Sequence, residues 1–367
     1  MSFKICLLIE SLNKGGAERS AGLLSVILSK LGYQVFIITL FDDIVYPYNA
    51  ELINIGKIKN TSGSIKNKLN RYLQLKNQIK KNNFDLILDY RIKESLIREI
   101  VLNTLVFKKQ NTISMIRSFN LKLYLPEPKI LSKFLYKNYL GLNSVSFKIE
   151  NNLIINYSFK NTLTIHNPID IEDIQKKSDE DLCIDEKYIL AVGRLEPIKQ
   201  FDKLLECYKN SELPGKNINL YIMGDGEEKD LLESLIVKFN LRNTVEILPF
   251  QVNPFKYMKR ALFLVLSSKN EGFPRVIMES LACDTPVVSF NCESGPDEII
   301  HNKYNGLLVE NQNFLALTMA MNSMIKDEKL YKICKQNSLT SIKEFSMESI
   351  SVKWDNYIKG VLNNKYI

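Results

Sequence analysis

The sequence lacks the features of membrane-spanning and disulfide-built proteins. Its longest apolar run, 261–266, is far shorter than the ~18 residues that a membrane-spanning helix needs. Its six cysteines are scattered and form no CxxC pair, so we expect buried free thiols in a reducing compartment. The N-terminus runs from a lysine into a short apolar stretch without a small-residue cleavage site, so we expect no signal peptide.

Histidine is scarce as well. Only His166 and His301 occur, and no cluster of metal ligands stands out, so we expect that the protein requires no metal ion and no other cofactor. His166 suits a structural position at the end of a strand as well as it suits a catalytic role.

What the sequence does contain is an asymmetry of charge. Residues 1–168 carry 24 lysines and arginines against 11 acidic residues, whereas residues 169–367 carry 25 against 30. Two halves of opposite sign indicate two modules with different partners. A basic half attracts nucleic acid, an anionic membrane or a phosphorylated substrate, and charge alone does not choose among them.

Short apolar runs alternate with helical periodicity along the whole chain, which is typical of parallel sheets with helical crossovers. Helices are expected at 17–31 and 64–81, and the polar stretch 167–185 is expected to be a linker. The expected strands are 3–9, 35–40, 86–88, 112–116, 145–147, 163–165, 188–192, 220–223, 245–248, 262–266 and 286–289. The expected fold class is therefore α/β, with two doubly wound domains.

Ligands of doubly wound sheets bind beyond the carboxyl ends of the strands, so residues that follow strands are the candidates for a site. Gly193, Arg194 and Lys199 follow the strand at 188–192, and an arginine and a lysine on either side of one turn suit a shared anion. Cations beside a loop are also common without any function. The turn 223–228, MGDGEE, follows the next strand and would suit any fold.

The most specific motif is 271–279, EGFPRVIME. Pro274 suits the first turn of a helix, so Glu271 lies before that helix and Glu279 within it, with Val276 and Ile277 facing the core. Two carboxylates near one strand end accept hydrogen bonds from several sugar hydroxyls, although Glu279 also suits a solvated face. The segment 294–298, SGPDE, offers backbone N–H groups to a phosphate or a sugar hydroxyl.

Gly15 and Gly16 lie in the segment 13–19, NKGGAER, directly after the first strand. Paired glycines let the backbone approach a ligand, and the N-terminus of the next helix favours an anion. A tight turn from strand to helix is an equally good explanation. The segment is not GxGxxG, so a dinucleotide fingerprint is missing.

In this order and spacing, the GRL segment with Lys199, the GDG turn, the Glu-x7-Glu pair and the GPDEI segment resemble retaining glycosyltransferases of family 4. The resemblance covers the whole chain and is most specific at 188–310. It implies the GT-B fold, in which two Rossmann-like, doubly wound parallel-sheet domains face each other across a cleft. It also implies an acceptor-side domain at 1–168, a nucleotide-sugar-binding domain at 169–345, and a C-terminal helix at 346–367 that packs back on the first domain.

The resemblance implies roles for the candidate residues. Arg194 and Lys199 would bind the donor diphosphate, Glu271 would hold the transferred sugar, and Glu279 would bind the nucleotide ribose; Glu271, Arg194 and Lys199 form the catalytic set. The implied donor-binding set is Gly15, Gly16, Gly193, Arg194, Lys199, Gly272, Phe273, Glu279, Ser294 and Gly295. Breaking the bond from a sugar to a nucleoside diphosphate adds about one negative charge to the leaving group, which fixed cations stabilise in place of a metal.

Two positions depart from the family's pattern. Ser294-Gly295 stands where the family has a glycine pair, and Asp89-Tyr90-Arg91 stands where many members have a histidine. We therefore take Asp89, Arg91 and Arg117 as the acceptor-side candidates. The GGAER loop and the segment 116–120, IRSFN, are similar to bacterial members that build O-antigen, capsule and related glycans.

The resemblance thus implies a retaining transferase that moves a hexose or N-acetylhexosamine from a UDP-sugar to a glycan or lipid-diphosphate-linked acceptor. Four alternatives were weighed. A glycosidase would leave the phosphate-binding loops without a purpose, and a nicotinamide-dependent oxidoreductase lacks its third glycine. A sugar-nucleotide epimerase of the GT-B fold is a rival, against which the Glu-x7-Glu pattern argues. A basic nucleic-acid-binding protein would suit the first half, but its aromatics follow apolar stripes rather than a stacking platform.

The basic residues of the first half are clustered. Eight lie within 57–81, and Lys129, Lys133 and Lys137 are spaced four apart on one expected helical stripe, with Ile130 and Phe134 expected on the other side. An amphipathic helix that covers the sheet explains this pattern. So does docking on the anionic cytoplasmic leaflet of the inner membrane, which would place a cytoplasmic, peripheral enzyme beside a lipid-linked acceptor.

Overall fold

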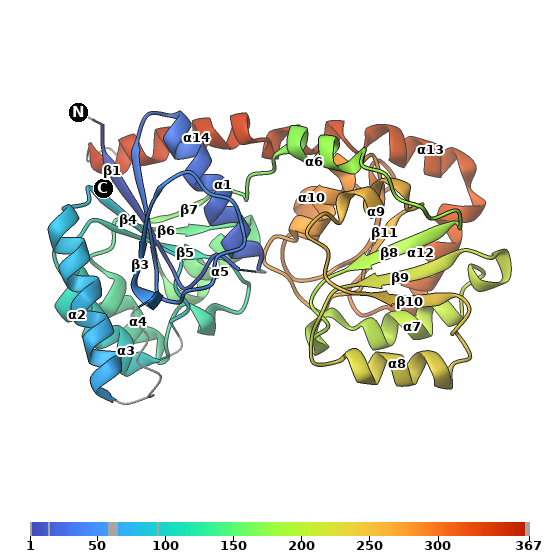
Figure 1. The fold of residues 1–367 in the computed structure, drawn as a ribbon, viewed down its shortest axis with the longest axis horizontal. Helices are drawn as coiled ribbons and strands as arrows, with labels where there is room; N and C mark the ends of the chain where they lie inside the picture. The colour runs from blue at the N-terminus through green and yellow to red at the C-terminus, as the bar shows by residue number, and fades with distance from the viewer. Residues whose placement is uncertain (1, 14, 58–64, 94, 364–367) are drawn as a thin grey trace. The chain divides into compact units, whose positions relative to one another are not determined.

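The chain folds into two compact units, each with its own parallel sheet and its own core (Figure 1). The computed structural model describes residues 2–13, 15–57, 65–93 and 95–363. The first unit comprises the chain up to Pro168 together with the segment from Met347 onward, and the second unit is Ile169–Ser346. In the described part of the chain, no helix is both long and apolar enough to cross a membrane.

The sheet of the first unit has the strand order β3-β2-β1-β4-β5-β6-β7, and all of its strand pairs are parallel. Its winding direction switches between β1 and β4, as in doubly wound folds. The strands are β1 (Lys4–Ile9), β2 (Gln34–Thr39), β3 (Glu51–Asn54), β4 (Leu86–Asp89), β5 (Thr112–Ile116), β6 (Gly141–Ser144) and β7 (Thr162–Thr164).

Six helices accompany this sheet in the described part of the chain. They are α1 (Gly16–Lys30), α2 (Ile65–Asn82), α3 (Leu96–Leu102), α4 (Lys129–Tyr136), α5 (Phe147–Tyr157) and α14 (Met347–Leu362). Helix α14 joins the first core, where Trp354 is 2% exposed, and the Tyr33 hydroxyl donates to Asp355 Oδ1 at 2.7 Å.

The sheet of the second unit has the order β10-β9-β8-β11-β12-β13 and is also parallel throughout. Its strands are β8 (Tyr188–Val192), β9 (Asn219–Met223), β10 (Val245–Leu248), β11 (Leu264–Leu266), β12 (Val287–Asn291) and β13 (Gly306–Glu310). Its helices are α6 (Ile171–Ser178), α7 (Phe201–Lys209), α8 (Lys229–Lys238), α9 (Phe255–Arg260), α10 (Arg275–Ala282), α11 (Pro296–Ile299), α12 (Phe314–Lys326) and α13 (Glu328–Asn337).

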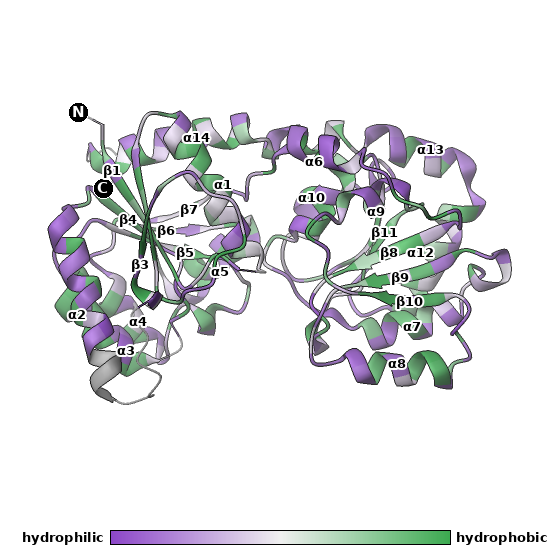
Figure 2. Ribbon diagram, in the orientation of Figure 1, coloured by the Kyte–Doolittle hydropathy of each residue, from purple (hydrophilic) through white to green (hydrophobic). Residues whose placement is uncertain are grey.

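The α/β fold class predicted from the sequence is confirmed. Strands β1, β4, β8 and β9 are mostly hydrophobic (Figure 2), because central strands of a parallel sheet are covered on both faces. Most predicted strands lie within two residues of the observed ones. The sequence prediction missed β3 and β13, which lie at the edges of their sheets, and also β6, which lies between β5 and β7.

Three local predictions were wrong. The segment 145–147 is not a strand, because the Ser146 side chain caps α5 by accepting from the Ile149 N–H at 3.2 Å. The stretch 167–185 is not simply a linker, because Asp170 caps α6, which packs on α9 and α10. In α4, Ile130 and Phe134 do not lie on a side opposite the lysines: they are 85% and 61% exposed, and the lysines at 129, 133 and 137 are exposed as well.

Candidate active site

In the second unit, two of the predicted loops are joined at the carboxyl ends of β8 and β9. The Gly193 N–H donates to the Met223 carbonyl at 3.0 Å, and the Leu195 N–H donates to the Asp225 carbonyl at 2.9 Å. A Cβ atom on Gly224 would lie 1.9 Å from the Gly193 carbonyl oxygen, so this close approach of the two backbones requires glycine. The GRL and GDG segments therefore form one rigid structure.

Lys199 and Glu271 meet at the same edge, although 72 positions separate them in the sequence. Lys199 Nζ lies 2.5 Å from Glu271 Oε1, and the side chains remain 17% and 13% exposed. Lys199 ends a short 3₁₀ turn after β8, and the Ser267 hydroxyl after β11 fixes its carbonyl oxygen at 2.8 Å. The structure thus brings together two members of the predicted catalytic set, and leaves both within reach of a ligand.

Arg194, the third member of that set, has a different partner. Its Nη1 lies 2.7 Å from Glu196 Oε1, and its side chain is 66% exposed. An exposed ion pair of this kind contributes at most about 1 kcal/mol, so an anionic ligand would easily displace Glu196. That Arg194 and Lys199 share one anion stays a prediction.

Helix α10 and the loop before it position the other donor-side candidates. Ile277 is fully buried as expected, whereas Val276 is only half-buried. Glu279 is 6% exposed, and its Oε1 lies 3.5 Å from Arg275 Nε one turn away. The Phe273 ring packs edge-to-face on Phe345, with centroids 5.3 Å apart.

Ser294 explains the departure from the expected glycine pair. Its buried hydroxyl donates to the Gly272 carbonyl at 2.6 Å and ties the loop after β12 to the loop before α10. Gly295 adopts a φ of +94°, and a Cβ there would lie 2.6 Å from Pro274 Cδ, so the second glycine is needed for space and backbone conformation.

Gly15 and Gly16 begin α1 in the first unit, with Gly15 as the N-cap. A Cβ on Gly15 would lie 1.9 Å from Glu18 Oε2, which shows that the Glu18 carboxylate covers this glycine. Lys14 lies outside the described residues. The expected contact of these glycines with donor phosphates stays a prediction.

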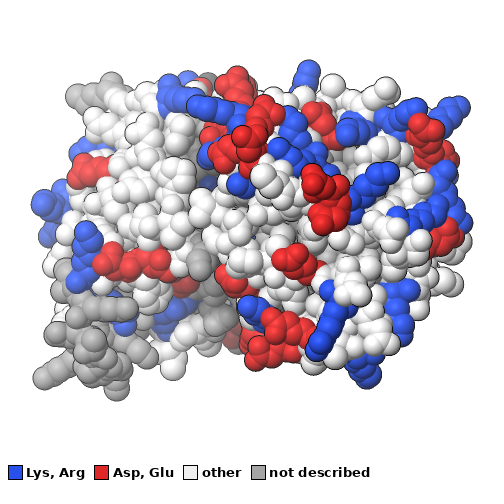
Figure 3. Space-filling model, turned by 45° about the vertical axis from the view of Figure 1, so that its right-hand side comes forward, with Lys and Arg blue, Asp and Glu red and all other residues white. Residues whose placement is uncertain are grey.

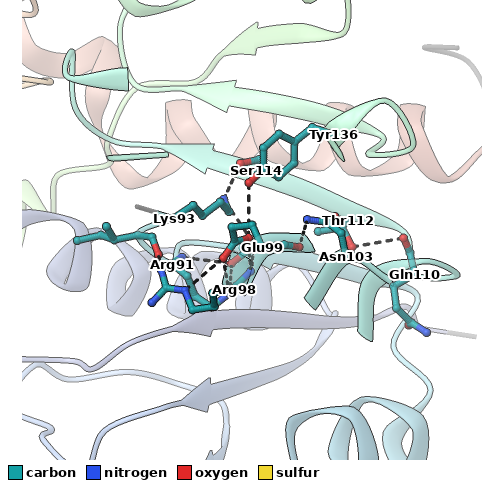
Figure 4. A network of polar contacts seen from close by, with 11 residues as sticks. Arg91, Lys93, Arg98, Glu99, Asn103, Gln110, Thr112, Ser114 and Tyr136 are labelled. Atoms are coloured by element: carbon teal, nitrogen blue, oxygen red, sulfur yellow. Dashed lines mark hydrogen bonds and ion pairs between the residues drawn. The ribbon is translucent and has the colours of Figure 1, made fainter. Parts of the chain in front are cut away.

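Arg91, Lys93 and Glu99 belong to a buried ion-pair network (Figure 4), and Asp89 is the second carboxylate of this network. The Arg91 guanidinium donates to both oxygens of Asp89, at 2.9 and 2.8 Å, and its Nη1 lies 3.2 Å from Glu99 Oε1. Lys93 Nζ lies 3.5 Å from Asp89 Oδ2 and donates to the Ser114 hydroxyl at 2.7 Å. All four charged side chains are at most 2% exposed.

Opposite charges favour the ionised forms of Asp89 and Arg91 against the cost of burial. Burial acts to raise the pKa of Asp89, but Arg91 and Lys93 hold that pKa below its ordinary value. Burial also acts against the charge of Arg91, yet Asp89 and Glu99 raise its pKa. Asp89 and Arg91 therefore offer almost no surface to an acceptor in this structure. Sequence reasoning missed Lys93, Glu99 and Ser114, because no short motif links partners from two strands and a helix.

Arg117 has a different environment at the end of β5. Its Nη2 donates to Asn143 Oδ1 at 2.7 Å, and its guanidinium lies over the Tyr90 ring, 5.0 Å from the centroid. Among the residues that the structure describes, no carboxylate pairs with it. His166 is 5% exposed and packs against Phe147.

No group of three or more potential metal ligands gathers in the described part of the chain. The acidic triplet 179–181 follows α6 at the surface, where Asp179 pairs with Lys259.

A family model described as "Glycosyl transferases group 1" matches residues 170–340, which include the Lys199–Glu271 pair and α10. The chain is 30% identical to the N-acetylgalactosamine-N,N'-diacetylbacillosaminyl-diphospho-undecaprenol 4-alpha-N-acetylgalactosaminyltransferase of Campylobacter jejuni. The match covers 97% of this chain and 100% of that enzyme. The chain therefore belongs to the group 1 glycosyltransferases, and it is an enzyme of polysaccharide or lipid-linked glycan synthesis.

Two further proteins extend this likeness. The amylovoran biosynthesis glycosyltransferase AmsD of Erwinia amylovora is 26% identical over 97% of this chain and 99% of its own. The crystal structure of Anabaena Alr3699/HepE in complex with UDP has a TM-score of 0.75 and 18% identity, and the match covers 98% of this chain and all of that one. The predicted GT-B fold is confirmed by this structural likeness.

Proposed function

We propose that this chain is a retaining glycosyltransferase that moves a hexose or N-acetylhexosamine from a UDP-sugar to a glycan or lipid-diphosphate-linked glycan. The observation that carries this proposal is the contact between Lys199 and Glu271 at the carboxyl edge of the second sheet. A lysine ammonium has three N–H groups, so Lys199 can keep its bond to Glu271 and donate to a phosphate oxygen as well.

The chemistry divides between the two side chains. As the bond from the anomeric carbon to the leaving diphosphate breaks, about one negative charge develops on that diphosphate, and Lys199 stabilises it together with Arg194. Glu271 accepts hydrogen bonds from the hydroxyls of the transferred sugar, beside the backbone of Gly272 and Phe273. Glu279 binds the ribose of the donor.

A UDP donor and an α-linked product are supported by the relatives. The Anabaena structure holds UDP, and the printed name of the Campylobacter enzyme specifies a 4-alpha transfer of N-acetylgalactosamine. Fixed cations in place of a metal ion would make the transfer independent of divalent metals.

The test is turnover of a panel of nucleotide sugars with lipid-linked acceptors, followed by NMR analysis of the product. We expect release of UDP, an α-glycosidic bond, and full activity in EDTA. A β-linked product would disprove retention, and loss of activity in EDTA that manganese restores would disprove metal independence. If no nucleotide sugar turns over while the chain still binds UDP-sugars, the proposal of a transferase fails.

The acceptor of the Campylobacter enzyme is named as a diphospho-undecaprenol glycan, and a lipid-linked acceptor would place this chain at a membrane surface. We therefore propose peripheral docking at the cytoplasmic face of the inner membrane, through the exposed side of α4. That side carries Ile130 and Phe134 among Lys129, Lys133 and Lys137, all of them exposed. Apolar side chains framed by lysines suit an anionic bilayer.

Other basic residues add less to this proposal. Within 57–81, Lys59 and the side chains of Lys66 and Lys68 lie outside the described residues. On the face drawn in Figure 3, basic and acidic side chains are intermixed, so net charge alone does not define a docking surface. The exposed apolar side chains of α4 single out that helix. Next to it, Lys129 lies over the Tyr157 ring of α5, where Ile155 is 76% exposed.

A further inference from the structure

At the carboxyl edge of the first sheet, Arg117 differs from the buried cations Arg91 and Lys93, because no carboxylate of the described residues pairs with it. Arg91 and Lys93 are neutralised by Asp89 and Glu99. Arg117 is held by neutral groups instead, namely the Asn143 amide, the Met115 sulfur and the Tyr90 ring. Among the described residues, its guanidinium pairs with no acid.

The hydrogen-bonding capacity of Arg117 is not used up. Its Nε is buried and has no hydrogen-bond partner among the described residues. Burial lowers the pKa of Arg117, although an arginine stays protonated at any physiological pH. Arg117 is half-buried, and a partly desolvated cation without an opposite charge is unfavourable, so its position favours an anion that the free chain does not supply.

The surroundings hold this guanidinium in one orientation. Asn143 donates from Nδ2 to the Leu163 carbonyl at 3.1 Å, which turns its Oδ1 toward Arg117. Tyr90, 5% exposed, supports the flat face of the guanidinium. Tyr90 follows β4, Arg117 follows β5 and Asn143 lies in β6, so neighbouring strands build the arrangement where doubly wound sheets bind ligands.

We propose that Arg117 binds a phosphate-class anion of the substrate, and that this anion is the diphosphate that carries the acceptor glycan. The inference rests on the proposed transferase function. Arginine is suited to phosphate because its planar group donates two parallel hydrogen bonds. The donor diphosphate already has Lys199 and Arg194 in the second unit, so the acceptor is the substrate whose anion still needs a cation.

The test compares two acceptors that bear the same glycan, one on a short-chain lipid diphosphate and one on an uncharged alkyl chain, both in detergent. The wild-type chain should prefer the diphosphate acceptor. Arg117→Gln should raise KM for that acceptor about 10- to 100-fold and leave KM for the uncharged one unchanged. Arg117→Lys should recover part of the loss, because it keeps the charge without the fork.

The other outcomes of this experiment distinguish a failure of the inference from a failure of the proposed function. Equal loss on both acceptors, or no wild-type preference for the diphosphate, would overturn the inference while the transferase function stands. A raised KM for the nucleotide sugar would assign the anion to the donor instead. If Arg117→Gln unfolds, the wild-type preference and the Arg117→Lys variant still decide. If no nucleotide sugar turns over with either acceptor, the proposed function itself has failed.

Discussion

Two ion-pair sites at the carboxyl ends of the two sheets differ in what surrounds them. The network of Asp89, Arg91, Lys93 and Glu99 is closed, because these four side chains are buried and pair with one another. Arg98, at its rim and 30% exposed, also pairs with Glu99. The Lys199–Glu271 pair is open, with side chains 17% and 13% exposed. The charges of a closed network stabilise the fold, whereas the charges of an open pair stay accessible to a ligand.

This difference predicts opposite responses to mutation. Removing one member of a buried, balanced network leaves an uncompensated charge in a medium of low dielectric constant. Removing one member of the open pair leaves a charge that water can still reach. The closed site should therefore govern stability, and the open site should govern turnover.

The largest expected effect is on the closed network. Arg91→Met leaves Asp89 with Lys93 alone and Glu99 with the partly exposed Arg98 alone. It should lower the free energy of unfolding of the first unit by about 3–5 kcal/mol. The chain has a single tryptophan, Trp354, which lies in the first core, so its fluorescence in denaturant follows this unit.

The matched control for this prediction restores the charge balance. Arg91→Met combined with Glu99→Gln leaves Asp89 paired with Lys93 in the buried part, while Arg98, 30% exposed, stays in reach of water. This double variant should recover most of the lost stability. If Arg91→Met stays fully stable but raises KM for the acceptor, the network is not closed and Arg91 contacts the acceptor, as the sequence suggested.

The next effect concerns the open pair. Lys199→Ala should lower kcat about 100- to 1000-fold, because the developing charge on the leaving diphosphate loses its fixed cation. Arg194→Ala should fall in the same range if its guanidinium leaves Glu196 for the donor. Lys203→Ala, on the nearby helix α7, is the control and should retain full turnover. Unfolding transitions of all three should match the wild type, and a large loss of stability in Lys199→Ala would class the pair with the closed network.

Substitutions of Glu271 and Glu279 should affect different kinetic constants. Glu271→Gln should mainly lower kcat, since Glu271 lies beside Lys199 where charge develops. Glu279→Gln should mainly raise KM for the donor, since a ribose that does not react is bound equally in the ground and transition states. We expect changes of about 10- to 100-fold in each case. Steady-state kinetics over a range of donor concentrations measures both, and the opposite pattern would exchange the two roles.

The sequence predicted the open site better than the closed one. Lys199, Glu271 and Ser294 stand in local motifs after strands, and the carboxyl edge of a parallel sheet brings such loops together whatever their separation in sequence. Glu99 and Ser114 carry no such signal, because their partners depend on how α3 lies against β4 and β5. The sequence suggested Asp89 and Arg91 as acceptor residues because they stand where many family members have a histidine, but both are buried in ion pairs.

The sequence also did not predict which side chains of a short helix are exposed. The apolar residues of 129–136 suit a core-facing stripe, yet Tyr136 and Ser132 form the buried side of α4. The Tyr136 hydroxyl lies 3.5 Å from Glu99 Oε2, so the inner side of this helix borders the closed network. Its outer side is left to Ile130 and Phe134.

The smallest effects are predicted for residues on the outer side of α4. This helix has one side that packs in the fold and another side that we propose binds a membrane. The wild-type chain should cosediment with vesicles that contain anionic lipid. Replacing Lys129, Lys133 or Lys137 singly by Gln should weaken binding about fivefold each, since each basic residue near the surface contributes about 1 kcal/mol. This contribution should vanish at high salt, because the attraction is screened over about 10 Å at 0.1 M.

Phe134→Ser separates insertion of the apolar side chain from attraction of charge. It should weaken vesicle binding equally at low and high salt, because transfer of an apolar side chain into the bilayer does not depend on ionic strength. The control is Met319→Ser on α12, where the methionine is equally exposed, at 61%, but belongs to the second unit. It should bind as the wild type does, and transfer to an acceptor in detergent should be unchanged in both variants. If the wild-type chain stays in the supernatant at low salt, or binds neutral vesicles equally well, α4 is not a membrane-docking helix and the transferase acts without it.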